Sequence, residues 1–461
     1  MAIGTAAVLR RIDLIKKRAF GLAAKYHSPQ AAAWLLYLTS KTSLAKSQKT
    51  KQGGRRYRML ALSVNKAGFQ QDIEESFAEE FDIVYWPIFA LRIFADTILS
   101  PELHNNKHYL SDDPKIETTK SEYRDFLRQT WKHLLNIMPL HVVVSPNYGY
   151  YIQREFAAAL EESGTPFIVL HKENLKSPGR LEYWRAVYEA RRGRFSGRKI
   201  LVYNDIERDL QVTTGVTDPE KVIVTGMPRL DRIHKWRLQR ARIEHTIGQP
   251  QVLFFAFDKS DKLPASRGSS IPEIDRRWGS LSWGTLCEKT HAAIANLARL
   301  RPDLRVIVKT KSIARHQEDI VRMLRQNDGP LPANLEVVCG GDSFQLLAES
   351  NVVVGFNTTA QLEAMAAGIP VIVPWFDEAI DPKTRDFVIE LGNSVEYANS
   401  PEEIIKLVCG HIDHPKKPHE ELTPEVQSAL RTWTSNNDGN SRRRVLDAVY
   451  RELNEDLAVR K

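Results

Sequence analysis

The amino-acid sequence predicts an α/β protein built from two doubly wound domains that face each other across a cleft. Three observations support this prediction. The chain has 461 residues, which is too long for one ordinary hydrophobic core. Short runs of Val, Ile and Leu alternate with helical patterns in two blocks, as expected for parallel sheets covered on both faces. Glycines and prolines cluster between the blocks, at residues 226–250, and we expect the domains to join there.

The composition is that of a folded globular protein, with 42% hydrophobic and 26% charged residues. This balance excludes a disordered chain and a fibre. The three cysteines, Cys287, Cys339 and Cys409, lie far apart, form no metal-ligand spacing and are odd in number. They make a poor disulfide framework, so we expect a reducing, cytoplasmic environment.

Positive charge is concentrated at the N-terminus. Residues 1–58 contain thirteen Lys or Arg and one acid, Asp13, a net charge of +12. Because the whole chain carries +8, residues 59–461 sum to about −4. A nucleic-acid enzyme more often carries basic charge across its folded face. We therefore expect no nucleic-acid partner, and a basic N-terminal arm and linker over residues 1–56.

The arm also carries apolar residues at helical spacing. They are Val8, Ile12, Ile15, Ala19 and Leu22, and a second apolar run, residues 31–38, includes Trp34 and Tyr37. That run is far shorter than the roughly 20 residues that span a bilayer. A basic amphipathic helix with aromatic anchors suits an anionic membrane surface. The alternative is a helix packed on the protein's own flank. The first interpretation predicts a cytoplasmic protein held at the inner face of a membrane.

The first domain is expected over residues 57–225, with alternating strands and helices. Its expected strands are residues 57–64, 81–85, 140–145, 166–171 and 199–203, and its expected helices start at 72, 121 and 153.

The second domain repeats the pattern over residues 251–415, and helices in residues 416–461 close the chain. The expected strands are residues 251–257, 305–309, 335–339, 351–355 and 369–373. A long polar loop, residues 258–284, follows the first of them. Loops of this length inside a compact domain are usually functional or disordered, and we expect a lid over a bound ligand.

The most informative segment is residues 351–374, NVVVGFNTTAQLEAMAAGIPVIVP. It predicts a buried strand, a small polar turn and a helix N-terminus. Free N–H groups and the helix dipole favour phosphate there. Glu363 lies one helical turn after Thr359, where a carboxylate can accept from the hydroxyls of a ribose. The alternative is that Thr358 or Thr359 only caps the helix and Glu363 is a solvated acid.

This segment resembles the donor site of GT-B glycosyltransferases, enzymes with two facing Rossmann-like domains. Residues 215–232, GVTDPEKVIVTGMPRLDR, resemble an interdomain segment shared by CDP-glycerol glycerophosphotransferases, bacterial surface-carbohydrate transferases and UDP-N-acetylglucosamine 2-epimerase-like proteins. The resemblance covers roughly residues 199–375. It implies that Thr358 and Thr359 hold the donor phosphates and Glu363 the ribose, without a metal or a cofactor. Asn357 and Arg229 are counted with these substrate-binding residues.

The chain departs from the glycerophosphotransferase pattern at one strand. Where that family has a His-Pro pair, this chain has Lys309-Thr310-Lys311. Lys309 and Lys311 can neutralise a diphosphate leaving group, although lysines at a strand end are often only exposed. The missing His-Pro pair favours a nucleotide sugar over a polyol-phosphate donor.

The first domain must supply an acceptor site and, for an inverting enzyme, a general base. His171 and Glu173 follow the strand at 166–171 and are the selected catalytic candidates. Other polar residues follow neighbouring strands and stay open as alternatives: Asn147, Tyr148, Asp205 and Glu207.

The expected function is metal-independent transfer of a sugar from a nucleotide-activated donor to a surface-polysaccharide or lipid-linked glycan acceptor. A nucleotide-sugar 2-epimerase shares the fold but needs acid and base groups on both sides of the sugar ring. A polyol-phosphate transferase and a non-enzymatic nucleotide-binding scaffold are the remaining alternatives.

Overall fold

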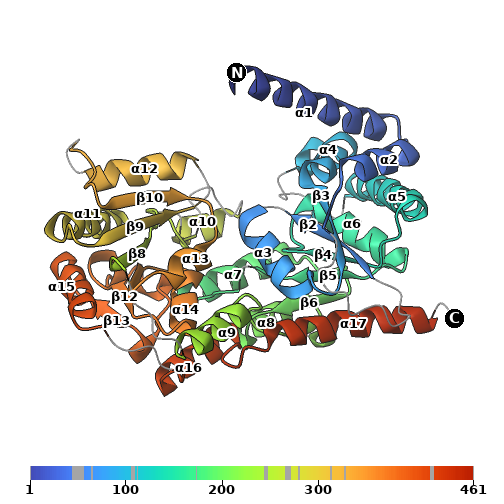
Figure 1. The fold of residues 1–461 in the computed structure, drawn as a ribbon. Coiled ribbons are helices and arrows are strands. Elements are labelled where there is room, and N and C mark those ends of the chain that lie inside the picture. The colour runs from blue at the N-terminus through green and yellow to red at the C-terminus, as the bar shows by residue number, and fades with distance from the viewer. Residues whose placement is uncertain are drawn as a thin grey trace.

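The computed structural model describes the chain except for residues 1, 44–56, 64–65, 105–108, 112, 173, 243–247, 265–270, 279–280, 312–313, 326–328, 416–419 and 460–461. The described part forms two α/β domains, one around a seven-stranded sheet and one around a six-stranded sheet. Figure 1 shows the two domains side by side. The fold predicted from the sequence, two doubly wound Rossmann-like domains, is confirmed.

The first sheet has the strand order β1-β3-β2-β4-β5-β6-β7. Its strands are parallel except β1, which pairs antiparallel with β3. The order reverses between β2 and β4, and ligands bind at such a switch point in open α/β sheets. The strands are β1 (Lys41–Ser43), β2 (Arg58–Ser63), β3 (Asp82–Pro87), β4 (Val142–Ser145), β5 (Phe167–Leu170), β6 (Lys199–Val202) and β7 (Val222–Val224).

The second sheet is parallel throughout, with the order β10-β9-β8-β11-β12-β13. Counted from β8, this is the 3-2-1-4-5-6 order of dinucleotide-binding sheets, with its switch point between β8 and β11. The strands are β8 (Gln251–Phe255), β9 (Arg305–Thr310), β10 (Leu335–Cys339), β11 (Val352–Gly355), β12 (Val371–Pro374) and β13 (Glu396–Ala398).

Helices cover both sheets, and three helices of the first domain, α4, α7 and α8, were not predicted. The first domain holds α3 (Lys66–Phe77), α4 (Ile88–Ile98), α5 (Pro114–Ile137), α6 (Tyr151–Glu162), α7 (Pro178–Arg191) and α8 (Asp205–Thr213). The later helices are α9 (Leu230–Arg240), α10 (Pro272–Trp278), α11 (Gly284–Leu300), α12 (Ala314–Arg325), α13 (Ser343–Ala348), α14 (Thr359–Ala366), α15 (Pro401–Asp413), α16 (Pro424–Thr434) and α17 (Ser441–Val459).

The N-terminal arm packs on the first domain. Its helices α1 (Ala2–Lys25) and α2 (Pro29–Thr39) contact α4 and α5. Phe20 and Leu36 are buried in the first domain's core. Of the predicted apolar stripe, Ile15 and Leu22 are 66% and 53% exposed, and the side chains of residues 1–12 lie outside the description. The arm therefore has a packed face and an exposed apolar face.

The end of the chain returns to the first domain. In Figure 1 α17 runs along this domain below its sheet, and Val445 and Val449 share a core with Phe77 of α3. The segment that returns to the first domain passes close to Gly226. Gly226 has a φ of +81°, and a Cβ added there would lie 2.7 Å from the carbonyl oxygen of Ser435. Glycine is therefore required there. Within the described residues, no helix is both long and apolar enough to cross a bilayer.

The segment expected to be a lid is partly built into the second domain's core. Trp278 of α10 and Trp283 are buried, and the Trp283 indole donates to the carbonyl of Asp261 at 2.7 Å. Residues 265–270 and 279–280 of this segment lie outside the description. The two tryptophans pack in the core of the second domain, because burying an apolar ring lowers the free energy of the folded chain more than exposing it on a polar loop would.

Candidate functional site

A cleft of about 310 Å³ lies at the switch point of the second sheet. We call it the second-domain cleft. Its walls come from residues 255–257 after β8, residues 309–311 at the end of β9, and residues 356–360 with Glu363 after β11. Gln71 of α3 closes it from the first domain. The cleft thus lies where a doubly wound sheet binds its ligand and where the two domains meet.

The turn between β11 and α14 is held by Asn357. Its φ of +49° is left-handed, a conformation that Asn tolerates better than most residues. The Nδ2 group of Asn357 donates to the carbonyl of Phe387 at 3.1 Å, and Oδ1 accepts from the amide of Ile389 at 2.8 Å. Asn357 was predicted to bind substrate. Its side-chain amide instead fixes the neighbouring loop, and Asn357 shapes the cleft wall.

Thr358 and Thr359 lie at the start of α14 and both line the cleft. The Thr358 hydroxyl accepts from the amide of Ala360 at 3.3 Å, and Gln361 Oε1 accepts from the amide of Thr358 at 3.0 Å. This is a capping box, in which two side chains satisfy backbone groups of the first turn. Thr358 is therefore the cap of α14. The hydroxyl of Thr359, the first helical residue, is the better candidate for a ligand.

Lys309 near the end of β9 and Lys311 just after this strand both line the cleft. Lys309 is buried, and its Nζ donates to the carbonyl of Thr310 at 3.1 Å. Burial lowers the pKa of Lys309, because the charged ammonium is poorly solvated there. An anion in the cleft would offset that cost. Lys311 is exposed and forms ion pairs with Asp261 and with Asp258, the latter at 3.7 Å.

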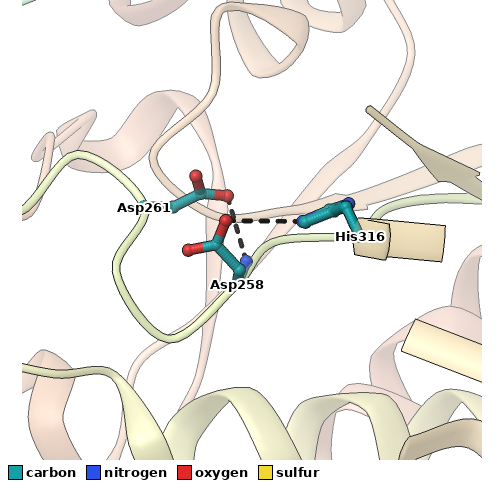
Figure 2. Close-up of side chains that lie close together, drawn as sticks. All are labelled: Asp258, Asp261 and His316. Atoms are coloured by element: carbon teal, nitrogen blue, oxygen red, sulfur yellow. Dashed lines mark hydrogen bonds and ion pairs between the residues drawn. The ribbon is translucent and has the colours of Figure 1, made fainter. Parts of the chain in front are cut away.

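Asp258, Asp261 and His316 lie close together beside Lys311, as Figure 2 shows for the three. Their ligand atoms lie within 4.8 Å of one another, so the cluster could geometrically hold a metal ion. Asp261 accepts from the Asp258 amide at 3.0 Å, and His316 Nε2 lies 3.5 Å from Asp258. Burial opposes ionisation of Asp258, but His316 and Lys311 outweigh it and hold its pKa well below the usual range. The ammonium of Lys311 already pairs with both carboxylates and offsets one of their two negative charges. The sequence had predicted no metal ligands and missed this cluster, which forms only when α12 packs beside the loop after β8.

Arg229, just before α9, lies between the domains. Its Nε donates to Glu363 Oε1 at 2.9 Å, and its Nη1 donates to Asp72 Oδ1 at 3.0 Å and to the hydroxyl of Tyr203 at 3.1 Å. Arg229 was predicted to bind substrate, but it is not among the described residues that line the cleft. Instead it joins α14 of the second domain to α3 of the first.

Glu363 lines the second-domain cleft, as the ribose prediction requires, and is not a solvated acid. Its side chain is 12% exposed. The ion pair with Arg229 uses Oε1, and Oε2 has no partner among the described residues. One carboxylate oxygen is therefore available to a ligand, and the other fixes its orientation.

A second cavity, of about 320 Å³, lies at the edge of the first sheet where its parallel strands end. We call it the first-domain pocket. It lies at the carboxyl ends of β4 and β5, opposite α7. The described residues that line it include Phe69 of α3, residues 146–150, Arg154, His171, Lys172, Lys176, Trp184, Tyr188, Arg191, Gly193 and Val216. The predicted candidate His171 and the alternatives Asn147 and Tyr148 all lie here. Glu173 lies outside the described residues.

His171 is held by a buried charged group. Its Nε2 lies 3.2 Å from Glu207 Oε1, and Lys176 Nζ lies 2.9 Å from Glu207 Oε2. Glu207 is fully buried. Burial opposes its ionisation, but Lys176 and His171 outweigh burial and lower its pKa to about 2. Glu207 is thus a permanent carboxylate behind His171, suited to orient the ring and not to take a proton at neutral pH.

The remaining alternative, Asp205, does not contribute to the pocket. It begins α8 and pairs with Arg208 at 2.6 Å on the exposed side of that helix. The basic and aromatic wall of the pocket on α7 was not predicted, although the sequence carries a signal for it. Trp184, Tyr188 and Arg191 are spaced four and three residues apart, which places them on one helical face.

Comparisons with known proteins concern the fold. No protein-family model matches the sequence, and a search of curated proteins finds no match. The solved structures similar to this chain include a UDP-GlcNAc 2-epimerase from Neisseria meningitidis bound to UDP-GlcNAc, with 11% identity over 86% of this chain and 100% of that chain, at a TM-score of 0.47.

Two further similar structures span two enzyme classes. A UDP-GlcNAc 2-epimerase from Methanocaldococcus jannaschii has 11% identity over 86% of this chain and 99% of that chain, at a TM-score of 0.45. A UDP-forming α,α-trehalose-phosphate synthase from Burkholderia xenovorans has 12% identity over 87% of this chain and 99% of that chain, at a TM-score of 0.44. At these identities and TM-scores the likeness concerns the general arrangement of the fold and says nothing of the activity of this chain.

Proposed function

We propose that this chain is a metal-independent glycosyltransferase that moves a sugar from a nucleotide-activated donor to a glycan acceptor of a surface polysaccharide or lipid-linked precursor. The observation that carries the proposal is the pair of cavities, one at the carboxyl ends of the strands of each sheet. Both cavities border α3, because Phe69 lines the first-domain pocket and Gln71 lines the second-domain cleft. Two substrates can therefore approach each other along α3.

The second-domain cleft suits the donor. The N-terminus of α14 and the hydroxyl of Thr359 offer hydrogen-bond donors to a diphosphate. Lys309 supplies a buried positive charge on the opposite wall, and Glu363 Oε2 can accept from the ribose hydroxyls. These groups also stabilise the nucleoside diphosphate as it leaves, because negative charge develops on its terminal phosphate when the bond to the sugar breaks.

The first-domain pocket suits the acceptor, with His171 as the general base. The attacking hydroxyl gives its proton to His171 while its oxygen bonds to the anomeric carbon of the donor sugar. The bond from that carbon to the diphosphate breaks at the same time, which is the inverting route. Both ring nitrogens of His171 are shielded from solvent here, and neither makes a hydrogen bond among the described residues. Nε2 lies 3.2 Å from Glu207 Oε1, so Nδ1 is the nitrogen that we expect to accept the proton. We expect the acceptor to reach it by displacing the Tyr148 ring, whose centroid lies 6.0 Å from that of His171.

A 2-epimerase on the same fold is the second candidate, because a nucleotide sugar alone would fill the second-domain cleft. Such an enzyme acts on one substrate and has no use for a separate cavity of similar volume in the other domain. The first-domain pocket therefore favours transfer. A polyol-phosphate transferase is disfavoured, because Lys309 and Lys311 occupy the positions where the resembled family has its His-Pro pair.

The test separates these reactions by their need for an acceptor. Nucleotide sugars with different bases and sugars are incubated with the protein alone and with candidate acceptors, and both nucleoside diphosphate release and sugar isomerisation are measured. Transfer predicts diphosphate release that depends on acceptor and falls by about 100-fold or more in His171→Gln. Isomerisation of a donor without acceptor would instead identify an epimerase.

The exposed face of the arm supports a peripheral position at the cytoplasmic face of an anionic membrane. Apolar side chains on this face are interleaved with Lys16, Lys17 and Arg18. Such a face is typical of helices that lie in a membrane interface. From residue 13 to the end of α2, the exposed large apolar residues are Leu14, Ile15, Leu22, Tyr26, Trp34, Tyr37 and Leu38. A lipid-linked acceptor would lie at the same surface.

A further inference from the structure

The cluster of Asp258, Asp261 and His316 lies beside the second-domain cleft. Of the three, only Asp261 is among the described residues that line the cleft. Asp258 and Asp261 belong to the loop after β8, and His316 lies in the first turn of α12 (Figure 2). The buried Trp283 indole donates to the carbonyl of Asp261 at 2.7 Å. The loop that carries the two aspartates is therefore anchored in the core of the second domain.

Each aspartate uses one carboxylate oxygen to shape this loop and directs the other at the cluster. Asp258 Oδ1 accepts from the amide and from the hydroxyl of Ser260, both at 2.8 Å. Asp258 Oδ2 faces His316 and Lys311. Asp261 Oδ2 accepts from the Asp258 amide at 3.0 Å, and Asp261 Oδ1 pairs with Lys311. Hydrogen bonds that orient carboxylates in this way are typical of metal sites.

His316 supplies the observation that points to a ligand. Its side chain is only 9% exposed, and both ring nitrogens are shielded from solvent and make no hydrogen bond among the described residues. Nε2 lies 3.5 Å from Asp258 Oδ2, which is longer than a normal hydrogen bond. A buried imidazole without a hydrogen bond is costly for the fold, and a bound ion would remove that cost.

The separations in the cluster are close to those around a metal ion. Two ligands of one tetrahedral Zn²⁺ lie roughly 3.3–3.6 Å apart, because Zn–N and Zn–O bonds are about 2.0–2.2 Å long. The 3.5 Å between His316 Nε2 and Asp258 Oδ2 falls in this range. The ligand atoms of all three residues lie within 4.8 Å of one another, so binding would draw them inward by about 1 Å.

The ammonium of Lys311 marks a position where a cation is already stabilised. It pairs with both carboxylates but offsets only one of their two negative charges. Its side chain is 48% exposed, so it can turn toward solvent at little cost. A divalent ion at this position would neutralise both carboxylates and would also bind the imidazole of His316. Lys311 and a metal ion therefore compete for the same place.

We propose that Asp258, Asp261 and His316 form a binding site for a divalent transition-metal ion, with Lys311 as a competing internal cation. One imidazole and two carboxylates suit Zn²⁺, whereas Mg²⁺ and Ca²⁺ prefer oxygen ligands alone. The inference goes beyond the proposed function and does not rest on it, because the proposed transfer uses no metal and the ion lies beside the donor cleft.

The test is calorimetric titration of the full chain, freed of metal by a chelator, with zinc chloride. We expect a zinc site of micromolar affinity or better that binds magnesium chloride at least about tenfold more weakly. Asp258→Asn and His316→Gln should each weaken zinc binding by about tenfold or more, because each removes one of three ligands. The matched control is His411→Gln, since His411 also pairs with a carboxylate of the second domain, at 2.7 Å from Glu396. It should leave the zinc affinity unchanged.

Lys311→Gln should change the affinity in the opposite direction. Without the competing ammonium, zinc should bind about tenfold more tightly. A gain of affinity cannot arise from unfolding, so this variant keeps the test decisive if His316→Gln folds poorly. Unchanged or weaker zinc binding by Lys311→Gln overturns the proposal.

Two further results would also overturn it. One is the absence of zinc binding by the wild type, or equal zinc affinity in the wild type and a folded His316→Gln. The other is loss of zinc binding in Cys339→Ser but not in His316→Gln, because the exposed thiol of Cys339 lies 3.4 Å from the Lys311 carbonyl. No nucleotide is present in these titrations, so their outcome is independent of the proposed donor site.

Discussion

Arg229 and Glu363 form an ion pair across the domain boundary, with 2.9 Å between Nε and Oε1. The same guanidinium contacts Asp72 of α3 at 3.0 Å. One side chain therefore couples the wall of the second-domain cleft to the helix that also borders the first-domain pocket. The relative position of the two proposed substrates depends on this contact, because α3 contributes Phe69 to one cavity and Gln71 to the other.

Two single variants, Glu363→Ala and Asp72→Ala, distinguish the proposed contact with the ribose from the contact between the domains. Each change leaves Arg229 with one carboxylate, so each should lower the free energy of unfolding by about 1–3 kcal/mol. Only Glu363→Ala should also raise the donor's KM, by about tenfold or more, because only Glu363 lines the cleft. Thermal unfolding and steady-state kinetics measure both effects. An equal rise in KM for the two variants would show that Glu363 acts only through domain position.

Thr358 and Thr359 should respond differently to replacement by Ala. Thr358 caps α14, so Thr358→Ala should lower the free energy of unfolding by about 1 kcal/mol. Thr359→Ala should leave stability nearly unchanged and weaken the binding of a nucleoside diphosphate by about tenfold. Thermal unfolding and calorimetric titration measure the two quantities. If Thr359→Ala binds the diphosphate as tightly as the wild type, its hydroxyl has no part in the donor site.

The buried pair of Glu207 and Lys176 should make stability depend on pH under acidic conditions. The pKa of Glu207 falls from its ordinary value of 4.5 to about 2 on folding. Because the folded pKa is the lower one, the stabilisation is complete above pH 4.5 and is lost as the pH falls toward 2. A shift of this size corresponds to roughly 3 kcal/mol. Unfolding free energies measured from about pH 6 to about pH 2.5 should show the loss.

A double variant provides the control for this effect. Glu207→Gln alone leaves Lys176 as a buried, uncompensated cation and is expected to be strongly destabilised. Glu207→Gln with Lys176→Met removes both charges, and its stability should vary less with pH than that of the wild type. The same acid dependence in the double variant would assign it to other carboxylates.

Replacement of Ile15 and Leu22 by Gln tests the membrane surface without removing the arm. Deletion of the arm would also remove Phe20 and Leu36 from the first domain's core. The double variant should bind anionic phosphatidylglycerol vesicles about tenfold more weakly in co-sedimentation, because two exposed apolar side chains no longer enter the interface. Binding by the wild type should weaken at high salt. The matched control is Leu300→Gln at the end of α11, where a 66% exposed leucine lies on the second domain. Equal sedimentation of all three proteins contradicts the membrane assignment.

The sequence predicted the longer strands because buried parallel strands are runs of Val, Ile and Leu, as in β4 and β11. It missed β1, β7 and β13, which have only three residues each. It missed α4 because an apolar helix, Ile88–Ile98, follows β3 directly and lacks a clear polar boundary. It missed α7 because Pro178 and Gly179 at its start suggest a turn. A proline is nevertheless well tolerated in the first turn of a helix.

The site was predictable where its chemistry is local in sequence. The turn and cap at Thr358 and Thr359 follow from neighbouring residues, and both residues line the cleft. The partners of Arg229 were not predictable, since Asp72 and Glu363 lie 157 and 134 residues away along the chain. For the same reason no sequence pattern joins His171 to Glu207, which meet only after β5 and α8 have packed.

The most direct test of the account is a crystal structure of the full chain with the nucleoside diphosphate that binds it most tightly. The account predicts that the diphosphate lies at the N-terminus of α14, within hydrogen-bond distance of Thr359 and of Lys309 Nζ, with the ribose hydroxyls at Glu363 Oε2. A diphosphate bound elsewhere, or no binding by any nucleoside diphosphate at millimolar concentration, would contradict the central claim that the second-domain cleft is a nucleotide-sugar donor site.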